Sequence, residues 1–367
     1  MVNEIVAQFD PTPPHPRHSG PAFFTVKDGT ILLAYSRSNS SAITNDNSPA
    51  DVVSLRSKDH GRTWSDAELM IRNTADMNVG VSTFLRFPDD RIAMVSSVKN
   101  SLHDCRPRLL TSSDEGVTWG EPRSVIAAPG YFVLNNDRVI QTSSGRLIVP
   151  VAYHRMKSED PVDLEFFDGR GIALWYLSDD LGETWREAKD WWTLPVRASS
   201  GLQEPGVVEL GNGRLMTYCR TGSGCQWAME SGDDGETWSA PQPTRFMSPN
   251  SPLCIKPIPG TDRFLAIWND HSGRYPFPEK TPVSSERLPL VSAIGDQQTG
   301  QHWIGHRIID DEEGCGFCYT AIHFVDDPDD GQQVLLAYCA GNVVESKNIL
   351  NRLRVRRVSL DWFMERC

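Results

Sequence analysis

A polar turn followed by a short apolar run recurs along the 367-residue chain. Each copy places small or acidic residues before several mainly apolar positions, a pattern that predicts a hairpin turn leading into a buried strand. The copies are Asp28–Leu33, Asp89–Met94, Ser144–Val149, Asn212–Thr217, Thr261–Ala266 and Gly331–Leu336. They leave about 61 residues per unit, which is enough for four strands and their loops. The pattern therefore predicts an all-β chain built from six similar units.

A second repeat, S-x-D-x-G-x-T-W, occurs four times without deviation, at Ser57–Trp64, Ser112–Trp119, Ser178–Trp185 and Ser231–Trp238. The Asp carboxylate can accept backbone N–H groups across a tight turn. The Gly can take a positive φ, and the Trp can pack on a neighbouring apolar face. We expect these residues to be structural, and we expect a weaker fifth copy at Asp296–Trp303. Repeats at this spacing predict a repeat architecture.

The second repeat resembles the Asp-box, or BNR repeat, of the sialidase (neuraminidase) superfamily of β-propellers. The resemblance implies one six-bladed β-propeller domain over residues 1–367 with Asp-box turns. Strand-like segments occur at both ends, at Glu4–Gln8 and Leu353–Leu360. We expect one of them to complete a blade that begins at the other end and so to close the ring.

Composition narrows the range of partners. The net charge is −12 with a pI near 5.2, which argues against nucleic acid or an anionic membrane surface as a partner. No stretch approaches the roughly 20 apolar residues of a membrane-spanning helix. The first residues carry no basic and apolar leader pattern, so we expect a cytoplasmic protein, or a secreted or periplasmic one if a leader precedes this sequence. The sequence does not indicate the oligomeric state.

The eight cysteines are scattered, mostly in strand-like runs, and we expect buried free thiols. Cys315 and Cys318 have C-x-x-C spacing, but no second pair at zinc-site spacing accompanies them. The nine histidines form no metal-binding motif, so we expect neither a metal nor another cofactor.

Polar residues at the predicted inner strands match the sialidase pattern in order. Glu204 precedes Arg220 by 16 residues, as in the segment that carries the base of the nucleophile and a carboxylate-binding arginine. Arg287 resembles a second arginine of that kind, and Tyr319 resembles the nucleophile. In the loop before the first Asp-box, Asp46 is the better candidate for the acid/base residue and Asp51 the second.

These residue types suit a sialic acid glycoside. The anomeric carbon of a sialic acid carries a carboxylate, which would repel an anionic nucleophile. A neutral Tyr hydroxyl activated by Glu avoids that repulsion, and sialidases with a Tyr nucleophile are a recognised exception to the paired-carboxylate rule of glycosidases. Arg groups bind the sugar carboxylate, and Asp donates a proton to the leaving oxygen. The resemblance therefore implies an exo-acting glycoside hydrolase that cleaves a terminal sialic or related acidic sugar from a glycan with retention.

The first unit departs from the family pattern. Aligned on Pro21, Ser19 stands where the family has the first carboxylate-binding arginine. Two interpretations remain open. Either Arg37 or Arg17 restores the third cation, or the pocket binds a different sugar.

The third unit keeps two further alternatives open. Asn136 belongs to the predicted inner residues, and His154 stands where an aromatic residue is common in the family. His154 and His18 are consistent with a propeller polysaccharide lyase or a uronate-linked glycosidase that uses His and Tyr. A non-catalytic glycan-binding propeller is the remaining alternative. The full set of candidate substrate-binding residues is Arg220, Arg287, Arg37, His18, Asn136 and His154.

Overall fold

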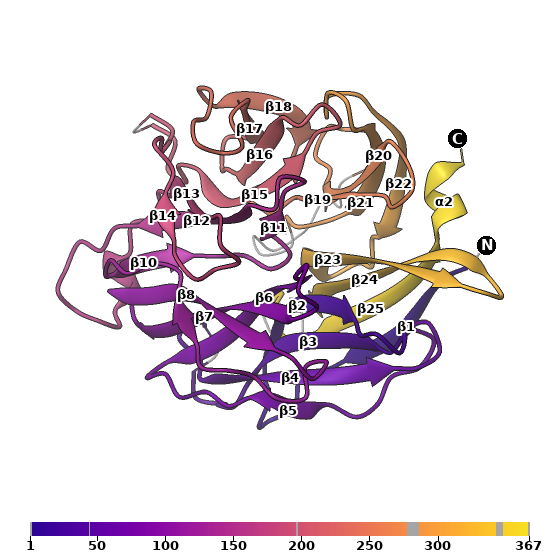
Figure 1. Cartoon of the computed structure of the whole chain (residues 1–367), viewed down its shortest axis with the longest axis horizontal. Coiled ribbons are helices and arrows are strands. Elements are labelled where there is room, and N and C mark those ends of the chain that lie inside the picture. Colours follow the sequence, from indigo (N-terminus) through magenta and orange to yellow (C-terminus); the bar gives the residue numbers. More distant parts are fainter. Residues whose placement is uncertain (1, 44, 196, 277–285, 343–347, 366–367) are drawn as a thin grey trace.

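The computed structural model describes residues 2–43, 45–195, 197–276, 286–342 and 348–365. The chain is all-β, and its sheets surround a central axis in a propeller arrangement (Figure 1). Helical structure in the described part includes the 3-10 helix η1 (Leu164–Phe166) and the short helix α2 (Leu360–Met364). No helix among the described residues has the length and apolar character needed to cross a membrane.

Four sheets have four antiparallel strands each. One consists of β2 (His18–Thr25), β3 (Ile31–Ser38), β4 (Ala50–Ser57) and β5 (Glu68–Ile71). Another consists of β15 (Gln203–Glu209), β16 (Leu215–Arg220), β17 (Cys225–Ser231) and β18 (Gln242–Met247). The next consists of β19 (Cys254–Pro257), β20 (Arg263–Asn269), β21 (Leu290–Asp296) and β22 (Trp303–Asp310). The last combines β23 (Cys315–Asp327), β24 (Gly331–Asn342) and β25 (Leu353–Ser359) with the N-terminal β1 (Asn3–Phe9).

The prediction of six blades is wrong, because the structure has four separate four-stranded blades and one continuous nine-stranded sheet. The strands of that sheet are β6 (Asn78–Arg86), β7 (Ile92–Ser101), β8 (Asp104–Ser112), β9 (Arg123–Ser124), β10 (Gly130–Val133), β11 (Ile140–Gln141), β12 (Leu147–His154), β13 (Ile172–Ser178) and β14 (Arg186–Glu187). The physical cause is β10, which pairs in parallel with β8 and antiparallel with β12. Its backbone groups thereby join strands that the sequence repeat assigns to two different units.

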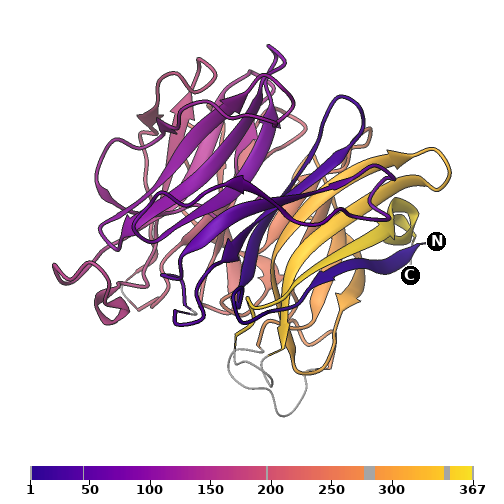
Figure 2. The same cartoon turned by 90° about the horizontal axis from the view of Figure 1, so that it is seen from below.

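The predicted strands at the two ends of the chain lie side by side. β1 pairs antiparallel with β25, from Asn3 opposite Val358 to Phe9 opposite Leu353. Figure 2 shows the two termini together at this edge. The expectation that one terminal strand completes a sheet begun at the other end is therefore confirmed. All six predicted turns also lead into strands, namely β3, β7, β12, β16, β20 and β24.

The four Asp-box copies share one hydrogen-bond pattern, which the first copy illustrates. Asp59 Oδ1 accepts the Thr63 backbone N–H at 2.9 Å, and Ser57 Oγ accepts the Gly61 N–H at 2.9 Å. Gly61 has a φ of 85°, and the preceding His60 also has a positive φ of 58°. The weaker copy keeps part of the pattern, because Asp296 Oδ1 accepts the Thr299 N–H at 2.8 Å. These turns follow strands of the sheets and do not line the main cavity.

The hydrophobic core lies between neighbouring sheets around the axis. Leu33 and Leu55 of one sheet pack with Leu335 and Val355 of the closing sheet in one buried cluster. Three Asp-box tryptophans, Trp64, Trp119 and Trp185, are partly buried and pack against such clusters, whereas Trp238 is buried within one. Because each sheet buries both faces against its neighbours, the inner strand ends are left to line the centre.

Candidate active site

A cavity of about 550 Å³ opens at the centre of the ring, a size that suits a small sugar. Its wall is built from the inner ends of several sheets, including those at Ser19, Gly80, Asn136, Glu204 and Tyr319. The strand pairing shifts register between Gln203 and Gly206 in β15 and between Cys318 and Ala321 in β23. A bulge of this kind turns a side chain away from the regular alternation of a strand.

Glu204 and Tyr319 occupy these two bulges and have positive φ angles of 45° and 57°. Such backbone conformations cost about 1 to 3 kcal/mol in non-glycine residues and cluster at functional sites. The Tyr319 hydroxyl donates to Glu204 Oε1 at 3.1 Å. Arg220 Nη1 donates to the other carboxylate oxygen at 3.0 Å and lies 3.4 Å from the Tyr319 hydroxyl. The structure therefore joins three of the predicted site residues in one hydrogen-bonded group.

The charges around Glu204 keep it ionised. Burial alone would raise the pKa of this carboxyl, but the Arg220 and Arg287 guanidinium groups outweigh burial and lower the pKa. Burial and the adjacent Glu204 carboxylate raise the pKa of Tyr319, so the hydroxyl is neutral at neutral pH. The pair is thus a protonated Tyr donor facing an ionised Glu acceptor.

Arg287 lies over the aromatic ring of Tyr319. Its guanidinium carbon is 5.6 Å from the centre of the Tyr319 ring, and its Nη2 donates to the Asn250 carbonyl at 3.4 Å. Asn250 Oδ1 accepts from Arg220 Nε at 2.8 Å. One asparagine therefore holds both predicted carboxylate-binding arginines at the cavity wall.

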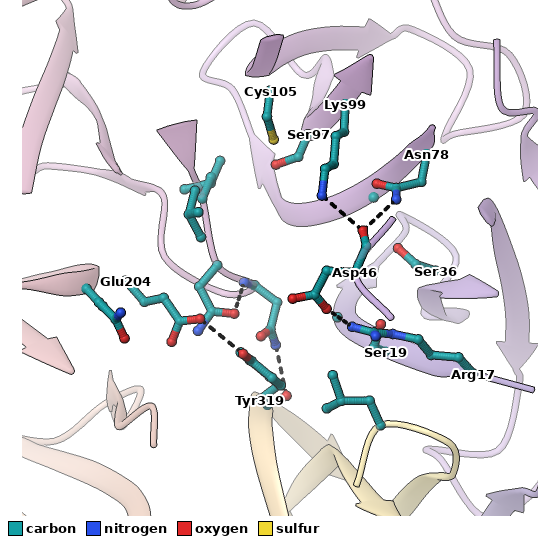
Figure 3. Close-up of a pocket in the computed structure, with 18 of the residues that line it drawn as sticks. Arg17, Ser19, Ser36, Asp46, Asn78, Ser97, Lys99, Cys105, Glu204 and Tyr319 are labelled. Carbon is teal, nitrogen blue, oxygen red and sulfur yellow. Dashed lines mark hydrogen bonds and ion pairs between the residues drawn. The ribbon is translucent and has the colours of Figure 1, made fainter. Parts of the chain in front are cut away.

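Asp46 lies across the cavity from Glu204, on the loop between β3 and β4 (Figure 3). Its Oδ1 accepts from Nη2 of Arg17, which lies just before β2 and also lines the cavity. Asp51 does not line the cavity, because its carboxylate accepts the Asn73 backbone N–H within the outer part of the sheet. Of the two acid/base candidates, the structure brings Asp46 to the site.

Lys99 was not among the predicted site residues, and it lies opposite Asn78 where β6 pairs with β7. Lys99 Nζ donates to the Asp46 carbonyl at 3.1 Å, to Asn47 Oδ1 at 2.8 Å and to the Tyr131 hydroxyl at 3.0 Å. Asn78 Nδ2 donates to the same Asp46 carbonyl at 3.0 Å, as Figure 3 shows. Lys99 ends the apolar run of β7 as Arg220 ends that of β16. That shared position is the sequence signal that could have identified Lys99.

His154 and Asn136 both line the cavity, and one nitrogen of each side chain contacts a backbone carbonyl. His154 Nδ1 lies 2.9 Å from the Asp168 carbonyl, and its ring stacks on Phe167 with centroids 4.8 Å apart. Asn136 Nδ2 donates to the Tyr319 carbonyl at 3.1 Å, while its buried Oδ1 has no partner among the described residues. Asn136 therefore supports the backbone of the Tyr319 bulge.

The structure places His18 and Arg37 outside this cavity. They are opposite each other on β2 and β3 and line a separate hollow with Tyr35 and His15. Arg37 therefore does not occupy the place of the missing first-unit arginine. Arg17, the other candidate, does reach the central cavity.

The cavity thus offers a Tyr–Glu pair, a second carboxylate and four cationic side chains, Arg17, Lys99, Arg220 and Arg287. Such a surface suits an anionic ligand with several hydroxyl groups. Within the described ranges, no group of three or more His, Cys, Asp or Glu residues could hold a metal ion. The seven cysteines of the described part are buried and free.

Residues 72–332 match the BNR repeat-like domain family, a span of more than half the chain. The curated anhydrosialidase of Macrobdella decora is 26% identical over an alignment of 217 residues, and the match covers 54% of this chain. The matched part spans only 24% of that relative's length.

Several solved structures have a similar fold. A protein of unknown function from Dyadobacter fermentans is 18% identical with a TM-score of 0.71, covering 97% of this chain and 99% of its own. The Ruminococcus gnavus intramolecular trans-sialidase bound to oseltamivir carboxylate is 15% identical with a TM-score of 0.70, covering 98% of each chain. The NanB sialidase of Streptococcus pneumoniae is 13% identical with a TM-score of 0.69, covering 99% of this chain and 71% of its own. At these identities the likeness concerns the fold.

Proposed function

Because the chain belongs to the BNR repeat-like domain family, within the sialidase superfamily of propellers, we propose that it is an exo-acting glycoside hydrolase of the sialidase type. Its substrate is a glycan that ends in a sialic acid or a related acidic sugar, and the anomeric configuration is retained. The observation that carries the proposal is the 3.1 Å hydrogen bond from the Tyr319 hydroxyl to Glu204 at the wall of the central cavity.

The proposed reaction has two steps. The Tyr319 oxygen attacks the anomeric carbon and gives its proton to Glu204, while the glycosidic C–O bond breaks with its electron pair on the leaving oxygen. Asp46 protonates that oxygen. A water molecule then attacks the anomeric carbon and gives a proton to Asp46, and Glu204 returns its proton to the departing Tyr319 oxygen. Two inversions at the same carbon give net retention.

The positive side chains explain the choice of an acidic sugar. Arg287 lies over the Tyr319 ring and Arg220 lies near the Tyr319 hydroxyl. A sugar carboxylate bound by both arginines therefore places the anomeric carbon to which it is attached next to the nucleophile. Bidentate Arg–carboxylate contacts fix orientation as well as charge. Tyr319 is uncharged when the substrate arrives, so the nucleophile does not repel that carboxylate.

The Tyr–Glu pair is tested by Tyr319→Phe, Glu204→Gln and the double variant on a fluorogenic sialoside. We expect each single change to lower kcat by about 10²- to 10⁴-fold, and the double variant to lose little more, since the two groups act as one unit. Tyr176→Phe is the matched control, because Tyr176 donates to Glu187 at 2.8 Å outside the cavity. A double variant whose loss equals the product of the single losses would contradict this mechanism.

One observation favours the uronate alternative enough to include it in the test. His154 lines the cavity, and a hydrogen bond from its Nδ1 to the Asp168 carbonyl leaves Nε2 as an acceptor that could remove a proton. A lyase product contains a new double bond that absorbs in the ultraviolet, whereas sialoside hydrolysis releases free sugar. Turnover of uronate polysaccharides alone, lost in His154→Ala and kept in Tyr319→Phe, would replace the sialidase proposal. Glycan binding without turnover would favour a binding module.

A further inference from the structure

Asp46 and Arg17 form an ion pair inside the cavity, which is an unusual state for a residue that must act as an acid. Nη2 of Arg17 donates to Oδ1 of Asp46. The Arg17 side chain is 15% exposed and the Asp46 side chain is 67% exposed. The other carboxylate that lines the cavity, Glu204, is paired with Arg220. Both carboxylates that line the cavity therefore have a guanidinium partner.

The ion pair holds Asp46 in its ionised form. The Arg17 charge lowers the pKa of Asp46, burial opposes it, and the Lys99 and Arg220 charges add to the lowering. Asp46, Tyr319 and Cys339 are the titratable groups that raise the pKa of Arg17 electrostatically, against the lowering effect of burial. An ionised carboxylate cannot donate the proton that the leaving oxygen needs. The free protein is thus held in the wrong protonation state for the first chemical step.

A sialic acid could change that state because of its own geometry. Its anomeric carbon bears both the carboxylate and the glycosidic oxygen, so a cation that meets the carboxylate must lie beside the acid that meets the oxygen. Arg17 and Asp46 have this relation, since they touch each other at the cavity wall. Serine at position 19 leaves the first unit without the family's usual arginine, and Arg17 is the first-unit cation that lines the cavity.

The loop can release Arg17 without moving as a whole. Lys99 Nζ and Asn78 Nδ2 both hold the Asp46 carbonyl, at 3.1 and 3.0 Å. Within the described part of the chain, the Asp46 carboxylate is bound through one oxygen, and its side chain is largely exposed, so a side-chain rotation separates it from Arg17. Solvent and another carboxylate can therefore reach the pair from the Asp46 side, while Arg17 stays mostly buried in the cavity wall.

We propose that the substrate carboxylate displaces Asp46 from Arg17, so that Arg17 completes the carboxylate site and the released Asp46 takes up a proton from solvent and becomes the acid. This inference rests on the proposed function. One hydrogen bond from Arg17 to Asp46 is exchanged for one from Arg17 to the sugar. The proton that Asp46 gains then passes to the glycosidic oxygen as the C–O bond breaks. Binding of an acidic sugar to Arg17 is thereby coupled to protonation of Asp46.

The test is calorimetric and does not require turnover. Binding of 2-deoxy-2,3-didehydro-N-acetylneuraminic acid is measured in buffers with different ionisation enthalpies, which gives the number of protons taken up. Uptake occurs at a pH between the free and bound pKa values of Asp46, so we expect up to about one proton per site near pH 4 to 5, falling towards zero near pH 8. The methyl ester of the same compound lacks the carboxylate and should bind more weakly without this uptake.

Variants separate Asp46 from the other titrating groups. Asp46→Asn should bind the acid at least as tightly as the unmodified protein, because the competitor for Arg17 is gone, and without proton uptake. Arg17→Met should weaken the acid at least tenfold and leave the ester nearly unchanged, with Arg17→Lys between the two. Arg123→Met, which removes a solvent-exposed pair with Glu183 away from the cavity, is the control and should change neither quantity.

Two results would overturn the inference while leaving the proposed function intact. One is tight binding of the acid with no proton uptake in the unmodified protein. The other is uptake that persists in Asp46→Asn, which would assign the proton to another group such as Glu204. Failure of both the acid and the ester to bind would instead count against the proposed function and the inference together.

Discussion

Lys99 shows how the site depends on a buried side chain whose charged group binds other protein residues. It is 3% exposed, and all three of its N–H groups are used, by the Asp46 carbonyl, Asn47 and Tyr131. Burial lowers the pKa of Lys99, against the raising influence of Asp46 and Cys105. Lys99 is therefore a positioning residue for the loop that carries the proposed acid.

We predict that Lys99→Met lowers the free energy of unfolding by about 1 to 3 kcal/mol, because Asn47, Tyr131 and the Asp46 carbonyl lose a charged donor. It should also lower kcat more for sialosides with poor leaving groups than for activated ones, since only the former need a well-placed acid. Denaturant titration and steady-state kinetics on two substrates check this. Lys58→Met, at an exposed position of the first Asp-box, should change neither measurement. Equal kinetic losses on both substrates would show a purely structural role.

Single residues also show the limits of sequence reasoning. Tyr319, Glu204 and Arg220 could be found because a fixed spacing and order identify them, and the structure joins them. The choice between Arg17 and Arg37 could not be made, because it depends on the face to which each points. A register shift between Ser19 and Ala22 places His18 opposite Arg37 and interrupts the simple alternation of the strand. Bulges are not visible in a pattern of apolar and polar residues.

At the scale of elements, the Asp-box turn was predictable because its bonds are local. Its glycine, however, has a second role that depends on the neighbouring sheet. A Cβ at Gly182 would lie 2.1 Å from Leu109 Cδ2, whereas a Cβ at Gly116 would meet nothing closer than Trp119 Cζ2 at 3.5 Å. Both glycines have similar positive φ angles, 82° and 79°. A comparison of the two positions therefore separates the cost of a positive φ from the cost of the contact with Leu109.

We predict that Gly116→Ala lowers the free energy of unfolding by about 1 to 2 kcal/mol through its left-handed backbone alone. Gly182→Ala should lose a further 1 to 3 kcal/mol or so, because Leu109 must move. Chemical denaturation of the two variants gives the difference directly. Similar losses in both would mean that Leu109 relaxes freely and that the close approach contributes little to the packing between sheets.

At the scale of the whole molecule, a buried ion pair lies where the closing sheet meets the first one. Arg357 of β25 is 1% exposed and donates to Asp327 at 2.7 Å, while its Nε donates to the His60 carbonyl of the first Asp-box at 3.4 Å. Arg62 of that Asp-box reaches the same Asp327 carboxylate at 2.8 Å. The pair thus connects segments from the beginning and the end of the chain.

The pKa of Asp327 predicts how stability depends on pH. Burial would raise it, but the Asp329 backbone N–H and the Arg62 side chain outweigh burial and lower the pKa from 3.8 to about 2. A carboxyl group whose pKa is lower in the folded than in the unfolded protein stabilises the folded state at pH values above the unfolded pKa. This contribution should therefore disappear as pH falls from about 4 to about 2. Asp327→Asn should flatten the decline of Tm across that window. At pH 7 it should lower the free energy of unfolding by about 1 to 3 kcal/mol, because buried Arg357 loses one of its two carboxylate partners and keeps Asp330 at 2.9 Å.

The exposed neighbour Asp326→Asn is the matched control and should keep the native pH dependence. Thermal unfolding followed by circular dichroism between pH 2 and pH 7 measures both variants, the lower bound being set by the pKa of about 2. If Asp327→Asn retained the full acid-induced fall in Tm, other carboxylates would be responsible for it.

The bridging strand β10 has a consequence for how the ring opens. In the four separate sheets, a fluctuation can break the hydrogen bonds of one blade and leave the others intact. Within the nine-stranded sheet, β10 pairs with β8 over two residues and with β12 over three, so a fluctuation that displaces β10 removes hydrogen bonds from both sides. In hydrogen-exchange terms, amides of β7 and β13 should therefore belong to one cooperative unit, whereas the remaining sheets exchange as several smaller ones. The strand that interrupts the sixfold repeat thus divides the ring into unequal units of local stability.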